Sequence, residues 1–184
     1  TLGIALVRSG SRVLLIDGDL RRSTIEKRLG LHTDVPGLTD LVLSDSDRIS
    51  DYVIREDKTG INFKRTGDAK FANATDIFSS NRMKKLIGRM KDEYDYILFD
   101  TPPVMAVADA RVIGGLVDST LFVVRWDKTP KKVARAALAL LRKGGTDIGG
   151  TVLQQVDLKR YGRFGYGDSG YYYHYGRYGK YYSS

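Results

Sequence analysis

The sequence predicts an α/β domain built as a doubly wound, mostly parallel sheet. Three short apolar runs, at residues 13–16, 96–99 and 120–124, have the length and composition of strands that are buried on both faces. Segments with helical periodicity separate these runs, and the strongest is the Ala- and Leu-rich stretch 131–143. Strands that alternate with helices in this order favour a parallel sheet with right-handed crossovers.

Glycines mark the expected ends of the first helices. Residues 1–9 are typical of the end of a helix that Gly10 closes, and a short helix over 24–29 is expected to end at Gly30. A further short helix is predicted at 38–43, after a Pro-Gly turn.

The remaining helices and strands have weaker signals in the sequence. Residues 44–60 are polar and predict a surface loop with one short helix at most, whereas the alternating segment 61–65 predicts an edge strand. Apolar side chains near helical spacing, with basic ones on the opposite face, predict one amphipathic helix over 76–90. A helix over 107–117 and a last core strand over 148–154 complete the predicted domain.

Composition bounds the class of protein. The chain has 184 residues and is 42% hydrophobic, which is enough for one domain with a core. The absence of cysteine excludes a disulfide framework and a thiolate metal site. No apolar run approaches the length of a membrane span. Because the chain opens at Thr1 inside a helical pattern, we expect it to be part of a longer protein, with room for an anchor elsewhere.

Carboxylates follow two of the predicted strands. Asp17 and Asp19 alternate with Gly18, so in an extended chain both side chains point the same way. Asp100 ends the second strand, which Pro102 and its neighbour stop. Open α/β sheets bind ligands at this edge, and carboxylates suit Mg²⁺ with phosphates attached. A solvated acidic turn is the alternative that the motif alone leaves open.

Residues 159–184 differ from the rest of the chain. Nine of the twelve tyrosines and six glycines lie within 161–182, with no apolar period of either kind. We therefore predict a domain of residues 1–158 followed by a mobile, disordered tail. The tail carries half of the net charge of +8. Its tyrosines suit self-association, stacking on single-stranded nucleic acid beside Arg163 and Arg177, or phosphorylation.

In combination, these motifs resemble the catalytic domain of bacterial tyrosine kinases, the cytoplasmic kinase parts of capsule and exopolysaccharide co-polymerases. That family belongs to the deviant-Walker P-loop group of the MinD and ParA ATPases. Residues 14–21 (LLIDGDLR) look like its Walker A′ motif and residues 97–103 (ILFDTPP) like its Walker B motif. Segments 73–83 and 124–130 and the tyrosine cluster are also similar to family features. The resemblance covers nearly the whole chain and implies a P-loop NTPase sheet of the MinD/ParA type.

Three features depart from the family pattern. The Walker A loop, G-x-x-x-x-G-K-[ST], is not found in the chain, so its lysine and its phosphate cradle are missing. Ala74 replaces the usual proline, and Gln154 stands where an asparagine near the base pocket is expected. A segment that is inert by itself is therefore one of the alternatives.

The resemblance implies ATP and Mg²⁺ as cofactors. It implies that Asp19 and Asp100 hold Mg²⁺, directly or through water, and that Asp17 lies nearest the acceptor hydroxyl, mainly to orient it. Arg21 is implied to contact phosphate or a neighbouring subunit, with a solvated surface arginine as the alternative. Asp17, Asp19 and Asp100 also form the implied nucleotide-binding set together with Gln154.

The resemblance gives the tail a role as substrate. Its tyrosines would be phosphorylated in the active site of the next subunit of a homo-oligomeric ring. Each phosphate adds roughly −1.5 to −2 charges, so two or three would cancel the positive charge of the tail and dissolve the ring. The expected phosphoacceptors are Tyr166, Tyr171, Tyr172, Tyr173, Tyr175, Tyr178, Tyr181 and Tyr182.

The implied function is a protein-tyrosine autokinase that regulates exopolysaccharide or capsule biosynthesis and export. Expected partners are a membrane polysaccharide co-polymerase anchor, fused or separate, and a cognate tyrosine phosphatase, with no nucleic acid. The expected location is the cytoplasmic face of the bacterial inner membrane. The alternatives are a MinD/ParA-like ATPase switch that phosphorylates nothing, and a nucleic-acid or membrane-surface protein that binds through the basic tail.

Overall fold

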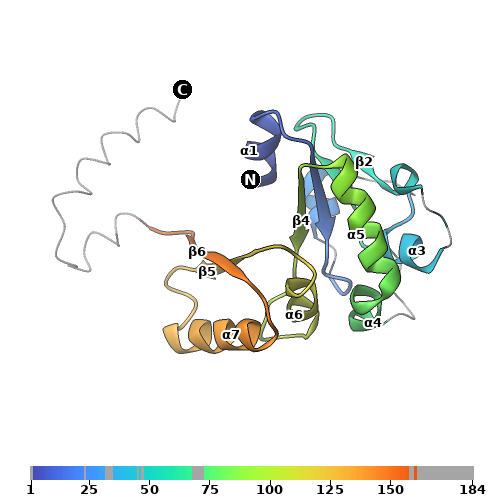
Figure 1. The fold of residues 1–184 in the computed structure, drawn as a ribbon. Coiled ribbons are helices and arrows are strands. Elements are labelled where there is room, and N and C mark those ends of the chain that lie inside the picture. The colour runs from blue at the N-terminus through green and yellow to red at the C-terminus, as the bar shows by residue number, and fades with distance from the viewer. Residues whose placement is uncertain are drawn as a thin grey trace, which may run out of the picture.

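The computed structural model contains two separate sheets with helices packed on them (Figure 1). Apart from Arg160, the predicted tail, with all eight expected phosphoacceptors, lies outside the described residues, so the boundary after residue 158 stays a prediction. The structure describes residues 2–22, 24–31, 35–44, 46, 48–67, 73–157 and 160.

A four-stranded sheet in the order β2-β3-β1-β4 forms the centre of the fold. Strand β1 (Val13–Asp17) pairs in parallel with β3 (Asn62–Lys64) on one side and with β4 (Tyr96–Asp100) on the other. The short strand β2 (Ile54–Arg55) is antiparallel to β3. The mostly parallel sheet predicted from the sequence is therefore confirmed.

The region before β3 is more ordered than predicted. A 3₁₀ helix, η1 (Ile49–Tyr52), and β2 both form within residues 44–60, where the sequence predicted a loop with one short helix at most. Because β2 adds to the outside of β3, the segment 61–65 is not the edge strand that its alternation suggested. The two-residue strand β2 is too short to leave a periodic signal.

Helices cover both faces of this sheet, as a doubly wound fold requires. Helix α1 packs on one face, where the α-carbon of Gly3 lies so close to Ile61 and Leu98 that a β-carbon would touch both side chains. On the other face, Leu14 and Ile16 join the main core cluster with side chains from α3, α4, α5 and α6. The helices of this part of the chain are α1 (Leu2–Arg8), α2 (Ile25–Leu29), α3 (Leu38–Leu43), α4 (Ala74–Ser79), α5 (Asn81–Glu93) and α6 (Asp109–Gly114).

The single helix predicted over residues 76–90 is wrong, because Ser80 divides it into α4 and α5. Ser80 has extended backbone angles (φ −65°, ψ 148°). Its hydroxyl donates to the carbonyl of Ile77 at 2.8 Å and accepts from the N–H of Met83 at 3.0 Å. One serine thus gives a backbone carbonyl at the end of α4 its hydrogen-bond donor and caps the start of α5.

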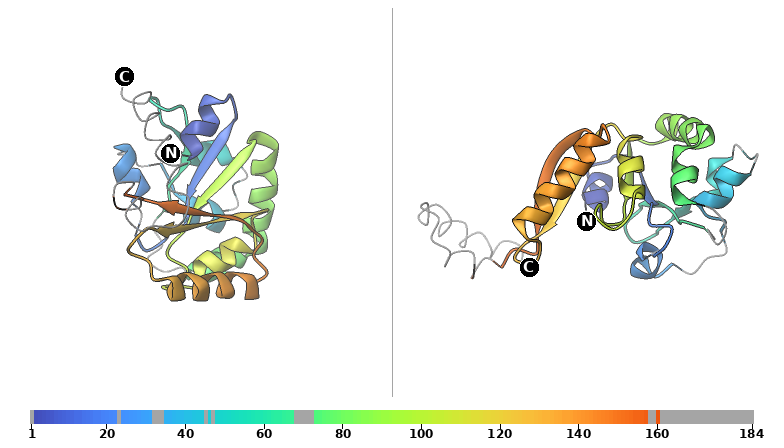
Figure 2. Two further views of the ribbon diagram at one scale, coloured as in Figure 1. Left: turned by 90° about the vertical axis from the view of Figure 1, so that its left-hand side faces the viewer. Right: turned by 90° about the horizontal axis from the view of Figure 1, so that it is seen from below.

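The remaining strands form a separate parallel pair. Within the described part of the chain, strands β5 (Thr120–Arg125) and β6 (Ile148–Gln154) pair only with each other, and α7 (Lys131–Lys143) covers one face of the pair. The left view of Figure 2 shows this pair running across the direction of β1 and β4. Residues 148–154 form the predicted strand, but the prediction that it lies in the core is wrong, because most of β6 is exposed.

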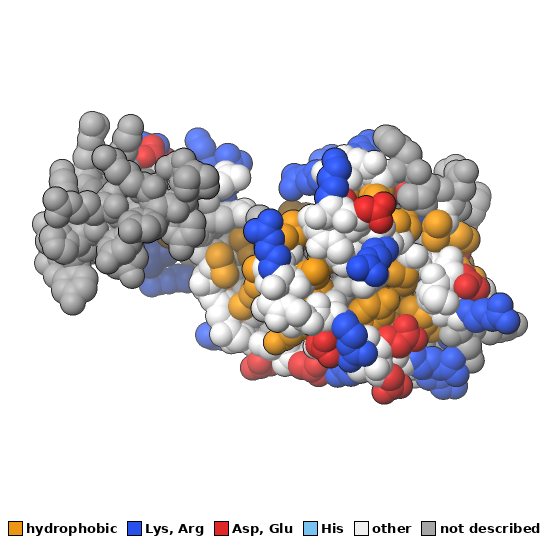
Figure 3. All heavy atoms as spheres, turned by 90° about the horizontal axis from the view of Figure 1, so that it is seen from above, with side chains coloured by type: hydrophobic (Ala, Val, Ile, Leu, Met, Phe, Trp, Pro, Cys, Tyr) orange, Lys and Arg blue, Asp and Glu red, His pale blue; other side chains and the backbone are white. Residues whose placement is uncertain are grey.

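The surface shows no large area of one charge on the face drawn in Figure 3, where Lys and Arg side chains are scattered among acidic and hydrophobic ones. None of the helices in the described part of the chain is long and apolar enough to cross a membrane.

Candidate functional site

Two of the predicted site residues lie side by side at the carboxyl ends of β1 and β4. Asp17 and Asp100 are direct partners in the parallel register of these strands. Side chains of paired residues in neighbouring strands project from the same face of a sheet, so both carboxyl groups face the side covered by α1. Asp17 is almost completely buried, with 1% of its surface exposed, whereas Asp100 is exposed.

Gly18 keeps the two strand ends close together. Its N–H donates to the carbonyl of Asp100 at 2.8 Å, which extends the pairing one residue beyond β1. A β-carbon on Gly18 would lie 2.8 Å from that carbonyl oxygen and 2.9 Å from the Cδ1 atom of Ile113. Any side chain at this position would therefore push β1 away from β4 and α6.

Asp19 takes part in a turn rather than continuing the strand, so the extended geometry in which its side chain would point the same way as that of Asp17 does not persist. The N–H of Asp19 donates to Oδ1 of Asp17 at 3.1 Å. Oδ1 of Asp19 in turn accepts from the N–H groups of Arg21 and Arg22, at 3.1 and 3.0 Å. Hydrogen bonding of an Asp side chain to nearby backbone groups is a common device for turning the chain.

Burial and two charged side chains act on the pKa of Asp100. Loss of water around the carboxyl group is the largest effect and raises the pKa of Asp100; the positive charge of Arg28 lowers this pKa, and the negative charge of Asp19 raises it. Within the described residues, no hydrogen bond or ion pair holds the side chain of Asp100. Its oxygens are therefore available to an external cation or donor.

Arg21 is anchored by a residue that the sequence analysis did not single out. Its guanidinium forms an ion pair and hydrogen bond with Asp109, whose side chain is 1% exposed at the first turn of α6. Half of the Arg21 side chain remains exposed. The contact with phosphate or another subunit stays a prediction, and a freely solvated arginine is excluded. The only signal for Asp109 in the sequence is an acidic residue near the start of a predicted helix.

Gln154 belongs to a different sheet from Asp17 and Asp100. It is the last residue of β6 and pairs with Arg125, and its carbonyl accepts from the N–H of Trp126 at 3.0 Å. The strand that ends at Gln154 belongs to the other sheet, so pairing does not bring it to the aspartates. Its predicted role in nucleotide binding stays a prediction.

The donor set fits a magnesium ion that is shared with a nucleotide. In the parts of the chain that are described, no three His, Cys, Asp or Glu side chains gather into a group that could hold a metal. Mg²⁺ commonly takes only one or two carboxylates and completes its shell with water and substrate phosphates. Asp19 and Asp100 supply that number of carboxylates.

Comparisons with known proteins identify the family of the chain. The family model of the AAA domain matches residues 1–128. The putative tyrosine-protein kinase AmsA of Erwinia amylovora is 33% identical over 165 residues, which cover 90% of this chain and 22% of AmsA. The chain thus spans about a fifth of that relative. The tyrosine-protein kinase YwqD of Bacillus subtilis strain 168 is 31% identical over 165 residues, 90% of this chain and 68% of YwqD.

Solved structures confirm the fold class. The kinase domain of the Escherichia coli tyrosine kinase Etk superposes with a TM-score of 0.78 at 28% identity, covering 85% of this chain and 60% of that one. The cell-division protein MinD of Aquifex aeolicus superposes with a TM-score of 0.70 at 19% identity, covering 89% and 64%. The second likeness shows the fold alone, which is the MinD/ParA type of P-loop sheet that the family resemblance implied.

Proposed function

Because this chain belongs to the family of bacterial tyrosine kinases, we propose that its protein transfers the γ-phosphate of ATP to tyrosine side chains. The observation that carries the proposal is the pairing of Asp17 with Asp100 at the ends of β1 and β4. This pairing places a buried carboxylate beside an exposed one, at the edge where open α/β sheets bind ligands.

We assign different tasks to the three aspartates. When bound, Mg²⁺ and ATP supply the transferable phosphoryl group and neutralise its charge. Asp19 and Asp100 would hold the metal ion, directly or through water. Asp17 would orient the acceptor phenol, because a tyrosine with a pKa of about 10 has little phenolate at neutral pH and needs a positioned acceptor for its proton.

Two hydrogen bonds support the geometry of these tasks. The backbone N–H of Asp19 fixes one oxygen of Asp17, and the hydroxyl of Thr66 donates to the carbonyl of Asp17 at 3.4 Å. The ion pair between Arg21 and Asp109 attaches the end of the turn that follows Asp17 to helix α6. A preorganised loop of this kind costs no rearrangement when substrate binds.

The acceptors are proposed to be the clustered tyrosines of residues 161–182, phosphorylated between subunits of a ring. We extend the proposal to regulation of exopolysaccharide or capsule export, with a membrane co-polymerase and a phosphatase as partners at the cytoplasmic face of the inner membrane. Support comes from the names of the relatives, which include a putative tyrosine-protein kinase in the cps region of Klebsiella pneumoniae.

The decisive experiment incubates the protein in its natural length with ATP and Mg²⁺ and maps phosphopeptides by mass spectrometry. Wild type is expected to carry phosphotyrosine within 161–182. Asp17→Asn should reduce its rate of formation by about 10²-fold or more. The control Asp92→Asn, an exposed acid on α5, should leave the rate unchanged.

The same experiment separates this proposal from its rival. Hydrolysis of ATP without any phosphotyrosine would replace the kinase with an ATPase switch, the alternative that shares its fold with MinD. Phosphotyrosine that persists in Asp17→Asn would keep the kinase and remove Asp17 from the reacting centre.

A further inference from the structure

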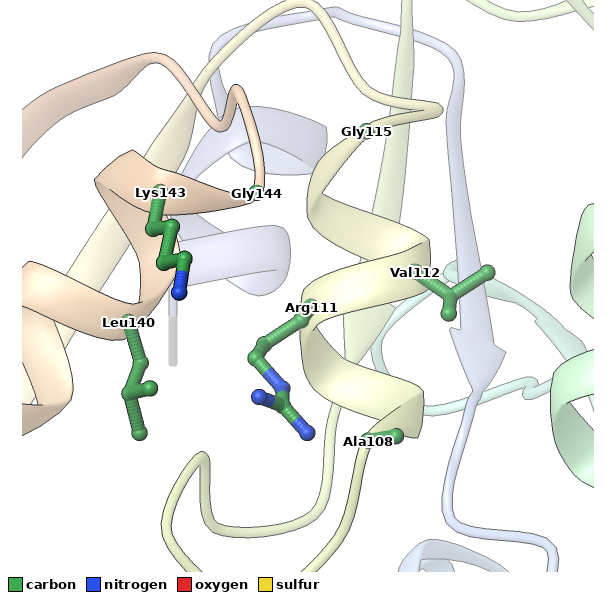
Figure 4. A pocket seen from close by; sticks show the side chains of 7 residues that line it. All are labelled: Ala108, Arg111, Val112, Gly115, Leu140, Lys143 and Gly144. Carbon is green, nitrogen blue, oxygen red and sulfur yellow. The ribbon is translucent and has the colours of Figure 1, made fainter.

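A hollow separate from the aspartates lies between α6 and the end of α7. Its volume is about 500 Å³. Figure 4 shows the two helices facing each other across this space. The lining residues are Ala108, Arg111, Val112 and Gly115 at α6, and Leu140, Lys143 and Gly144 at α7.

Two positive charges converge on this hollow, and no described carboxylate pairs with either of them there. The side chains of Arg111 and Lys143 point into the same space from opposite helices in Figure 4. No carboxylate is among the residues that line it. The Nε atom of Arg111 is buried and has no hydrogen-bond partner in the described part of the chain. Like charges repel and buried donors without partners are destabilising, so an anion in this space would relieve both effects.

The other residues that line the hollow are apolar or carry no side chain. Ala108, Val112 and Leu140 contribute only aliphatic surface, and the two glycines add no side chain. A free inorganic anion would contact the cations and leave these walls unused. A ligand that joins a flat apolar body to a doubly charged head would use the cations and the walls together.

We propose that this hollow binds the phosphotyrosyl side chain of a peptide. A phosphotyrosine carries nearly two negative charges at neutral pH, which matches the two cations. The guanidinium of Arg111 can bind two phosphate oxygens at once, and Lys143 adds a point charge. The ring lies against the aliphatic walls. This inference rests on the proposed function, because it makes the product of the kinase the ligand of a second site.

The position of the hollow connects it to the catalytic site. The same helix, α6, presents Arg111 to the hollow and Asp109 to Arg21. A phosphotyrosine bound at Arg111 therefore contacts the helix that anchors the loop of Asp17 and Asp19.

Binding of synthetic peptides tests the proposal independently of kinase activity. Fluorescence anisotropy is measured on the natural-length protein with a peptide of residues 168–178 that carries phosphotyrosine at position 173. Lys143→Gln and Arg111→Gln should each weaken binding by about tenfold. Arg142→Gln is the matched control, since Arg142 is the exposed neighbour of Lys143 on the same helix and does not line the hollow. It should bind as wild type does.

Further probes define the ligand. A phosphoserine peptide of the same sequence and inorganic phosphate should both bind at least about tenfold more weakly than the phosphotyrosyl peptide. A scrambled phosphotyrosyl peptide that binds equally assigns the site to the phosphotyrosyl group from any source, and a preference for the native order assigns it to the tail of this chain.

The proposal is overturned if Lys143→Gln binds the phosphopeptide as tightly as Arg142→Gln, or if inorganic phosphate binds as tightly as the peptide. Lys143 is exposed, so its substitution leaves the fold intact and the result stays interpretable even if Arg111→Gln does not fold. A protein that binds the peptide but forms no phosphotyrosine would contradict the proposed kinase activity alone.

Discussion

The four-stranded sheet and the β5–β6 pair are built from similar apolar segments, yet only the first contains a strand that is buried on both faces. Val13 and Leu14, which project from opposite faces of β1, are 1% and 0% exposed. Leu121 and Val123 of β5 are 50% and 52% exposed, because α7 covers only the opposite face of the pair. Parallel strands with this composition are normally covered on both sides. The comparison teaches that an apolar run identifies a strand, whereas its burial depends on which elements pack against it.

A matched pair of leucine truncations tests this difference and should give the largest effect. Leu14→Ala is expected to lower the free energy of unfolding by about 3 kcal/mol, because it leaves a cavity in the main core. Leu121→Ala should cost less than about 1 kcal/mol, because half of the side chain already contacts water. Urea unfolding followed by circular dichroism measures both. Equal losses would mean that Leu121 is covered in solution by a segment outside the described residues.

The second prediction concerns a buried cation in the better-packed region. Lys64 of β3 is fully buried, and its ammonium group donates to the carbonyls of Tyr52 at 2.9 Å and Pro36 at 3.5 Å and lies 4.4 Å from the centre of the Tyr52 ring. Burial lowers the pKa of Lys64 to about 7, an effect that Asp40 opposes and Arg65 reinforces.

Between pH 7 and about 10.5 the unfolded chain therefore binds more protons at Lys64 than the folded one does, so the free energy of unfolding should rise with pH. Below pH 7 both states are protonated and the full penalty of burying the charge remains. We expect a gain of roughly 2 kcal/mol across this range, allowing for some access of water. It should disappear in Lys64→Met but persist in the control Lys84→Met, an exposed lysine of α5. A pH dependence that is the same in both variants would contradict it.

A smaller effect tests whether the two regions unfold together. Gly88 lies within α5, is exposed, and has no atom within 4 Å of the position of an added β-carbon. Gly88→Ala should raise the free energy of unfolding by about 0.5–1 kcal/mol through helix propensity. Hydrogen exchange is expected to slow in β1 and to remain unchanged in β5 and β6, which would then open locally. Slowing in all three strands would show one cooperative unit.

The smallest predicted effect is a shift in the titration of Asp100. Asp19→Asn removes a nearby negative charge and should lower the pKa of Asp100, whereas Arg28→Gln removes a positive charge and should raise it. Carbon-13 NMR of the carboxyl group measures both shifts. If neither substitution moves the pKa, the loop of Asp19 and the helix of Arg28 lie farther from Asp100 than the structure shows.

The predictions that succeeded rest on local signals. The helix at residues 131–143 has the predicted bounds, because an Ala- and Leu-rich run between a proline and two glycines encodes both its ends. Gly30 ends α2 in the left-handed conformation, at φ 66°. Asp17 and Asp100 were predicted to converge because two similar strands each end in an aspartate, and their register confirms it.

The predictions that failed depend on contacts between distant segments. Tyr96 was expected to lie in the core at the head of β4 and is 47% exposed, because β4 is the last strand of its sheet. The partner of Arg21 went unpredicted, since Asp109 lies 88 residues further along the chain.

The sequence by itself determined most of the helices and strands, the glycine at the tip of β1 and the aspartates at the strand ends, because helix period, turn chemistry and apolar runs are local properties. Only the tertiary structure decided which strands became neighbours, that Asp109 is the partner of Arg21, and that Arg111 and Lys143 face one hollow. These features arise from packing between segments far apart in the chain, and packing energy depends on shape and partners that a local pattern does not encode.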